Sequence, residues 1–219
     1  MSESIPGAAP PAPESARAAG EATGARRDLA ARTKSAKPLP IVLYPHPVLK
    51  KRAREVTREE LLAGKAGEVD LRELVERMLA TMYEADGIGL AAPQVGIGLR
   101  LWVADPSKER NAAVLVINPV LSELHGTQEE EEGCLSLPEI RAHVKRYQRL
   151  VVSGLDSRGE PLSIPAADLL ARIVQHETDH LDGILFIQKI GTAARFMLRS
   201  RIKALENEYE ALARLRKKP

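Results

Sequence analysis

The chain has 219 residues, 44% of them hydrophobic and 28% charged, which is typical of one folded domain with appended segments. The formal net charge of +2 excludes a protein that attracts nucleic acid over its whole surface, but the charge is unevenly distributed. Residues 189–219 hold nine Lys or Arg and three Glu, a net charge of +6, so subtraction from +2 leaves −4 on the rest. We therefore expect any attraction to a polyanion to come from the C-terminal segment.

The single cysteine, Cys134, excludes an internal disulfide bond and favours a reducing compartment. No stretch reaches the roughly 18 consecutive apolar residues of a membrane-spanning helix. The N-terminus also lacks the charged and then apolar pattern of a secretory signal. These features predict a cytoplasmic protein without membrane or DNA partners.

Residues 1–38 are rich in Ala, Pro, Gly, Ser and Arg and contain almost no large apolar side chain, which predicts a disordered extension. A transit peptide is the alternative, but three glutamates and one aspartate in this segment argue against it. Ordered sequence is expected from about Leu39, where Pro45 and Pro47 should hold the chain extended.

The first helix is expected within residues 70–87, because apolar residues recur there at helical spacing. Asp70 and Glu73 form a capping-box pattern, and Gly87 can end the helix. The recurring apolar residues are Leu71, Leu74, Val75, Met78, Leu79 and Met82.

The middle of the chain is expected to be mainly β, with short apolar runs in residues 99–105, 112–119 and 149–164. Ser157, Arg158 and Gly159 interrupt the last run and predict a turn between two strands.

From Pro165 the pattern becomes helical, and an apolar stripe leads toward His176 and His180. Residues 192–217 predict a long, amphipathic and basic C-terminal helix. The stripe before the histidines consists of Leu169, Leu170, Ile173 and Val174.

The sequence QHETDHLDG, residues 175–183, contains an HExxH motif. On a helix, His176 and His180 project from the same face and can bind one cation, while Glu177 lies one position further round. In this pattern the glutamate takes a proton from metal-bound water, which indicates hydrolysis. A pair of surface histidines with ordinary partners is the alternative.

A third metal ligand is not evident downstream of His180, where the glutamates of residues 206–210 belong to a charged helix, and this weakens a conventional zinc protease. Upstream, the candidates are His143, the acidic run Glu129–Glu132 and Cys134. A thiolate is a strong ligand for Fe(II) or Zn(II). A lone cysteine is more often a small buried hydrophobe, but the two histidines favour Cys134 as a ligand.

Residues 86–100, DGIGLAAPQVGIGLR, form a glycine-rich segment. A phosphate-binding loop is excluded by the spacing of the glycines and by the absence of a following GK[ST]. The segment instead predicts an exposed backbone edge with one amide side chain, Gln94, that can donate a hydrogen bond. A simple turn is the alternative.

Taken together and in this order, GIGLAAPQVG, EGCLSLP and QHETDH resemble the three signature segments of peptide deformylases. The resemblance extends from about Tyr44 to about Ile190. It implies an α+β fold in which β-sheets surround a central helix that carries the HExxH motif, plus a C-terminal helix. The implied organisation is a disordered extension (1–38), a catalytic domain (39–190) and a basic C-terminal helix (191–219).

The same resemblance implies that Cys134 is the third ligand, beside His176 and His180, of a metal that is usually Fe2+, with Zn2+, Ni2+ or Co2+ able to substitute. The implied activity removes the N-formyl group from the initiator methionine of nascent peptides and releases formate. Water activated by the cation would attack the formyl carbon, while Glu177 passes its proton to the leaving amine. The Gln94 side chain and the backbone N–H of Leu135 would stabilise the formyl oxygen.

The substrate peptide is expected to bind as an added strand, with its methionine side chain in an apolar pocket. Arg172 is expected at the pocket mouth or in solvent, and Arg141 in the peptide groove or paired with Asp86 or Glu139. The expected substrate contacts are Ile88, Gly89, Gly133, Arg141, Leu169 and Ile173.

The basic C-terminal helix suits an RNA-rich partner, and in some bacterial deformylases this helix docks on the ribosome near the exit tunnel. A solvated helix is the alternative. Two other functions compete with deformylation: a zinc peptidase that does not use Cys134, and a non-catalytic protein that binds nascent chains. The second has no chemical need for intact Gln94, Cys134, His176, Glu177 and His180.

Overall fold

The structure is a computed structural model, and it describes residues 33–216. Most of the expected extension, residues 1–38, therefore lies outside the described residues. The described part begins with a short 3-10 helix, η1 (Thr33–Ser35), and a second, η2 (Pro47–Lys50), follows. The expectation that Pro47 keeps the chain extended is wrong, because its fixed φ also suits the first position of a helical turn.

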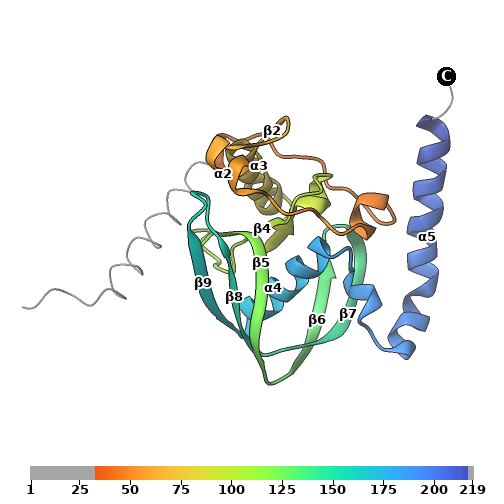
Figure 1. The fold of residues 1–219 in the computed structure, drawn as a ribbon. Helices are drawn as coiled ribbons and strands as arrows, with labels where there is room; N and C mark the ends of the chain where they lie inside the picture. The colour runs from red at the N-terminus through yellow and green to blue at the C-terminus, as the bar shows by residue number, and fades with distance from the viewer. Residues whose placement is uncertain (1–32, 217–219) are drawn as a thin grey trace, which may run out of the picture.

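Most of the remaining strands follow one another between α3 and α4, and three helices end the described chain (Figure 1). The helices are α2 (Arg58–Ala63), α3 (Leu71–Glu84), η3 (Ala92–Val95), α4 (Asp168–Leu181), η4 (Phe186–Gln188) and α5 (Thr192–Arg216). The strands are β1 (Lys65–Ala66), β2 (Val69–Asp70), β3 (Gly89–Ala91), β4 (Leu101–Ala104), β5 (Val114–His125), β6 (Gln128–Cys134), β7 (Leu137–Arg146), β8 (Arg149–Leu155) and β9 (Pro161–Ala167).

Five strands form one antiparallel sheet in the order β3-β4-β5-β8-β9, and β6 and β7 form a separate antiparallel pair. Figure 1 shows α4 between the large sheet and the β6–β7 pair. The expected α+β architecture, with strands around the helix that carries both histidines, is confirmed.

Strand β4 of the large sheet is buried on both faces, because a different helix covers each face. Leu101 and Val103 of β4 pack in the same apolar cluster as α3. The alternate residues, Trp102 and Ala104, pack in the cluster of α4. A strand covered on both faces has no polar side, which explains the uninterrupted apolar run in the sequence.

Helix α3 forms where the apolar spacing predicts it, and the side chain of Asp70 caps it by accepting a hydrogen bond from Glu73 N at 2.9 Å. The Glu73 carboxylate bonds to Arg77 instead of completing a capping box. The expected stop at Gly87 is displaced by one residue, since Asp86 adopts the left-handed conformation with φ of 58°. Aspartate tolerates this conformation better than most residues. The expected apolar residues of α3 are all buried: Leu71, Leu74, Val75, Met78, Leu79 and Met82.

The expected hairpin in residues 149–164 is present as β8 and β9, and the Asp156 carboxylate holds its turn by accepting from Arg158 N and Glu160 N. The β6–β7 hairpin was not among the expected strands. From Ile140 to the end of β7 every second residue is buried, as expected of a strand with one solvent face.

Helix α4 begins at Asp168, three residues after the expected start at Pro165, because β9 continues to Ala167. The expected C-terminal helix is present as α5 within the described residues. Residue 217, at the expected end of that helix, lies outside them.

Hydrogen bonds in the middle and at the C-terminal end of α4 fix its position. The Gln175 amide accepts a hydrogen bond from Tyr147 N at 3.0 Å and donates one to Tyr147 O at 2.9 Å, which ties the helix to the β7–β8 turn. At the C-terminal end, the buried Arg100 donates to Leu181 O at 3.2 Å and to the Asp182 carboxylate at 2.7 Å. The two histidines between these anchors are therefore held at a defined depth.

One face of α5 packs against an apolar cluster that includes β7 and η4. Tyr44 OH also donates a hydrogen bond to Glu206 at 2.9 Å. Figure 1 shows α5 along one edge of the molecule. None of the helices in residues 33–216 combines the length and hydropathy needed to cross a membrane. The docked residues of α5 include Ala194, Leu198, Ile202 and Leu205.

Candidate metal centre and active site

Three potential metal ligands converge where the end of β6 meets α4. The ligand atoms of Cys134, His176 and His180 lie within 4.8 Å of one another. Cys134 Sγ is 3.2 Å from His180 Nε2. Two imidazoles and a thiolate are a donor set that binds transition-metal ions. The described residues therefore contain a metal-binding cluster, made of the ligands that the sequence predicts.

His180 has the protonation state that a metal ligand needs. Its ring is 1% exposed, and its Nδ1 atom has no hydrogen-bond partner among the described residues. Burial, together with the nearby His176, keeps the pKa of His180 well below its usual value. The ring is therefore neutral, and a neutral imidazole is the form that binds a metal.

His176 is oriented by Glu132, whose carboxylate lies 2.9 Å from His176 Nδ1. Burial alone would lower the pKa of His176, but hydrogen bonds to Cys134 and Glu132 outweigh burial and raise the pKa to about 10. The negatively charged groups around this ring, which stabilise its proton, would also stabilise a bound metal cation. A carboxylate behind a ligating histidine is the usual way in which proteins fix such a ring.

Glu132 is buried among cations. Arg146 donates two hydrogen bonds to it, at 2.8 and 2.9 Å, and Arg172 donates one at 2.7 Å. Burial would raise the pKa of Glu132, but the hydrogen bonds from Arg146 and His176 lower it to about 2. Arg146 also pairs with Asp179, which in turn accepts from Lys189.

Of the two alternatives for Arg172, a solvent-facing side chain is wrong, because Arg172 lines the groove and is buried there against Glu132 and Val144 O. Sequence reasoning treated Glu132 only as one member of an acidic run, and it did not single out Arg146. The available signal was the strand period of two, which places Glu132 and its neighbour Glu131 on opposite faces of β6.

Glu177 lies beside the ligands and is 4% exposed, and its Oε2 atom has no partner among the described residues. Burial raises the pKa of Glu177 to about 7, although the charge of His176 opposes the shift. A carboxyl group with a pKa near neutrality can both accept and return a proton. Only glycine at position 89 leaves this carboxyl group in place, since a Cβ there would lie 2.4 Å from Glu177 Oε1.

Gln94 is buried on η3, and its amide orientation is fixed. Its Oε1 accepts from Ala91 N at 2.8 Å. Its Nε2 therefore points to Cys134 Sγ at 3.5 Å and Ser136 Oγ at 3.4 Å. The amide is ready to donate into the space beside the ligands.

A groove runs past this cluster, between the free edge of β3 and the free edge of β6. The only expected site residue that does not line it is His180, which lies beneath it. Ile88 and Leu169 expose 44% and 48% of their surface on this groove. The expected residues that line it are Ile88, Gly89, Gln94, Gly133, Cys134, Leu135, Arg141, Leu169, Ile173, His176 and Glu177.

Arg141 lines the groove as expected, and it pairs with neither Asp86 nor Glu139, the alternative partners named from the sequence. It approaches Glu131 at 3.5 Å, whereas Asp86 pairs with Arg110. The backbone carbonyl of Glu139 accepts a hydrogen bond from Arg201 of α5.

The fold and the cluster together define an α+β protein with a Cys/His/His metal site beside a buried glutamate. A family model described as polypeptide deformylase matches residues 38–196. The peptide deformylase of Thermodesulfovibrio yellowstonii is 45% identical over 167 residues, which are 75% of this chain and 96% of the relative. That of Acidobacterium capsulatum is 44% identical, covering 78% of this chain and 97% of the relative.

Two solved structures agree in fold. The crystal structure of a peptide deformylase from Legionella pneumophila has 35% identity and a TM-score of 0.68, covering 83% of this chain and 99% of that one. The structure from Thermotoga maritima has 42% identity and a TM-score of 0.63, covering 70% and 98%. The chain belongs to the polypeptide deformylase family.

Proposed function

We propose that the chain is a metal-dependent hydrolase that removes the N-formyl group from the N-terminal methionine of newly synthesised proteins and releases formate. Membership of the family supports the activity. The observation that carries the assignment to residues is the convergence of the Cys134, His176 and His180 ligand atoms within 4.8 Å, beside the buried carboxyl group of Glu177.

Cys134, His176 and His180 would hold the metal, for which Fe2+ is the proposed ion and Zn2+, Ni2+ or Co2+ are possible substitutes. When bound, the cation would acidify water and polarise the formyl group. Glu177 would accept a proton from the attacking water at its unpartnered Oε2 and deliver it to the nitrogen of the leaving amine.

The negative charge that develops on the formyl oxygen needs hydrogen-bond donors. The Gln94 amide, oriented by its bond from Ala91 N, and the backbone N–H of Leu135 are the proposed donors. Losing one such donor typically costs about 2.7 to 4 kcal/mol of transition-state stabilisation.

The substrate would bind in the groove as an added strand between β3 and β6, which both present a free edge there. Ile88, Gly89 and Gly133 would contact its backbone. Ile173 and Leu169 would form the wall for the methionine side chain, and Arg141 would lie beside the following residues.

The domain boundaries, location and partner are also proposals: a catalytic domain of residues 39–190, an extension before it, and a basic segment of residues 191–219, in a cytoplasmic enzyme. The four cations between Arg195 and Lys203 on α5 suit the RNA of a ribosome near its exit tunnel.

The test is formate release from formyl-Met-Ala-Ser by protein purified anaerobically with Fe(II), with metal content measured in each sample. The wild type should release formate, and Glu177→Gln should lose about 100-fold to 10,000-fold in rate while keeping its metal. A fully metallated wild type without activity would refute the proposal. Unaltered metal affinity in Cys134→Ala, with cleavage of unformylated peptides, would instead indicate the zinc peptidase.

A further inference from the structure

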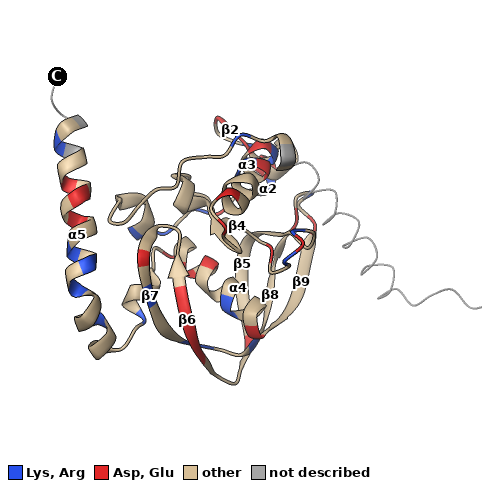
Figure 2. Cartoon of the chain, turned by 180° about the vertical axis from the view of Figure 1, so that it is seen from behind, with Lys and Arg blue, Asp and Glu red and all other residues tan. Residues whose placement is uncertain are grey.

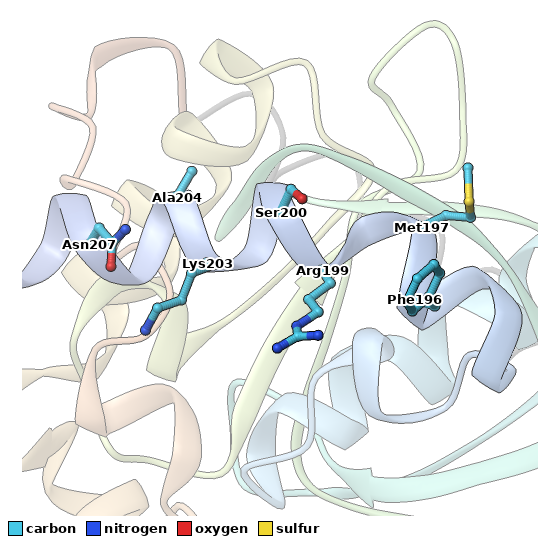
Figure 3. A pocket seen from close by; sticks show the side chains of 7 residues that line it. All are labelled: Phe196, Met197, Arg199, Ser200, Lys203, Ala204 and Asn207. Atoms are coloured by element: carbon cyan, nitrogen blue, oxygen red, sulfur yellow. The ribbon is translucent and has the colours of Figure 1, made fainter.

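The face of α5 that points away from the domain carries large exposed apolar side chains near both ends. Phe196 and Met197 expose 72% and 79% of their surface near its start, and Leu215 exposes 65% near its end. A shallow groove lies along the first part of this face (Figure 3). Its lining comes from α5 alone: Phe196, Met197, Arg199, Ser200, Lys203, Ala204 and Asn207.

The charges of α5 are divided along its length. Figure 2 shows basic residues in the first half, followed by a block of acidic residues and then a further basic segment near the C-terminal end. The first half carries Arg195, Arg199, Arg201 and Lys203, and the block that follows carries Glu206, Glu208 and Glu210. After the block, Arg214 lies 3.6 Å from Glu210 of the same helix, in an ion pair that is exposed to solvent.

We propose that this face binds the same face of a second copy of the chain, with the two α5 helices antiparallel and crossing near Ala204. In an antiparallel pair that crosses at Ala204, residues equally far before and after the crossing point lie opposite each other. Met197, seven residues before it, would therefore meet the small Ala211 of the other copy, seven residues after it. The acidic block of each helix then lies beside the basic half of its partner. A parallel arrangement would place like charges together.

Arg199 and Glu210 carry the pairing most directly. They are eleven residues apart, close to three helical turns, so they project from the same side of α5. In a two-fold antiparallel pair, the same flank of each helix lies beside the contact, because an isologous interface uses the same surface on both copies. Arg199 of each copy would therefore meet Glu210 of the other, which gives two intermolecular ion pairs.

The cations of the first half alone would suit RNA, but over its whole length the face suits a second copy better than RNA or a lipid surface. An anionic partner laid along the whole face would meet Glu208 and Glu210 as well as the cations. Ser200 and Ala204 allow a second helix to approach closely. Because one helix face is a small interface, we expect a weak dimer that forms with rising concentration. The proposal does not depend on deformylase activity, and a copy whose Arg199 is paired cannot offer it to a ribosome.

The test is sedimentation velocity of the full chain over roughly 5 to 500 µM at low salt. The wild type should pass from monomer to dimer. Arg199→Glu and Glu210→Arg should each raise the dissociation constant about tenfold or more, and the double variant Arg199→Glu/Glu210→Arg should restore it. Arg158→Glu, the same charge change in the exposed β8–β9 turn, is the matched control and should leave dimerisation unchanged.

Two results would overturn the proposal: a wild type that stays monomeric at every concentration, or a double variant that dimerises no better than the single ones. Binding of the monomeric wild type to a short RNA or to anionic phosphatidylserine vesicles, lost in Arg199→Glu, would assign the face to that partner instead. Circular dichroism should show an unchanged helix content, and formate release should match the wild type in all α5 variants, which separates this test from that of the activity.

Discussion

At the scale of single residues, Gly89 and Glu177 compete for the same space. A Cβ on residue 89 would lie 2.4 Å from Glu177 Oε1 and 3.0 Å from Ile173 Cγ2. The neighbouring helix cannot move aside, because Gln175 and Arg100 anchor it. The carboxyl group would therefore have to give way.

We expect Gly89→Ala to reduce formate release about 100-fold, since a displacement of about 1 Å at a reacting group has an effect of this size. Metal content should stay unchanged, because residue 89 touches none of the ligands. Gly98→Ala is the matched control, since a Cβ there has nothing within 4 Å. Full activity in Gly89→Ala would show that Glu177 has room that the structure does not provide.

Glu132 provides a second prediction at this scale. Replacing it by glutamine leaves the buried Arg172 without an anion and the buried Arg146 with Asp179 alone, which should lower the free energy of unfolding by about 3 to 5 kcal/mol. Metal affinity should fall about 10-fold to 100-fold, because His176 loses its charged partner. Denaturant unfolding and metal titration check the two effects.

Glu131→Gln changes the adjacent, exposed glutamate in the same way, and it should alter stability by less than about 0.5 kcal/mol. Equal effects in both variants would mean that the burial of Glu132 has no energetic role.

The metal ligands could be predicted from the sequence, but the buried ion pairs that hold them in place could not. His176, Glu177 and His180 are adjacent on one helix, so their geometry follows from local periodicity. The partners of Glu132 lie 14 and 40 residues away in Arg146 and Arg172. Nothing in the local pattern says that an arginine is buried, so the sequence left Arg172 open between the pocket and solvent.

At the scale of elements, α4 depends on one glutamine for its place against the β7–β8 turn. We expect Gln175→Ala to lower the free energy of unfolding by about 1 to 3 kcal/mol, because Tyr147 N loses its acceptor. Thermal or urea unfolding measures the change. The exposed Gln148→Ala is the control and should have a much smaller effect. A neutral Gln175→Ala would contradict the anchoring role.

Strands covered on both faces were predictable, whereas β6 and β7 were not. Strand β4 has an uninterrupted apolar run because α3 and α4 cover its two sides. Residues 128–132 of β6 are glutamine and four glutamates, which have low strand propensity. Tertiary pairing with β7 makes this segment a strand.

At the scale of the whole molecule, the metal site joins η3, the end of β6 and α4 across the core. Removing the metal should therefore destabilise the entire domain. At a free metal concentration about 1,000 times the dissociation constant, binding adds about 4 kcal/mol. We expect EDTA to lower the melting temperature of anaerobic wild-type protein.

Cys134→Ala should be insensitive to the chelator, whereas Glu177→Gln, which keeps all three ligands, should respond as the wild type does. A melting temperature that EDTA leaves unchanged in the wild type would mean that the metal contributes nothing to the fold.

The ligand sulfur of Cys134 is only partly buried, and it opens on the groove where the peptide would bind. Oxygenation of a thiolate to a sulfinic acid is in general irreversible, and the chain has no second cysteine to trap the earlier sulfenic acid as a disulfide. A bound peptide would cover this sulfur. Protein without bound peptide should therefore be oxidised faster in air than protein with bound peptide. Its lifetime in a cell would then depend on how often the groove is occupied.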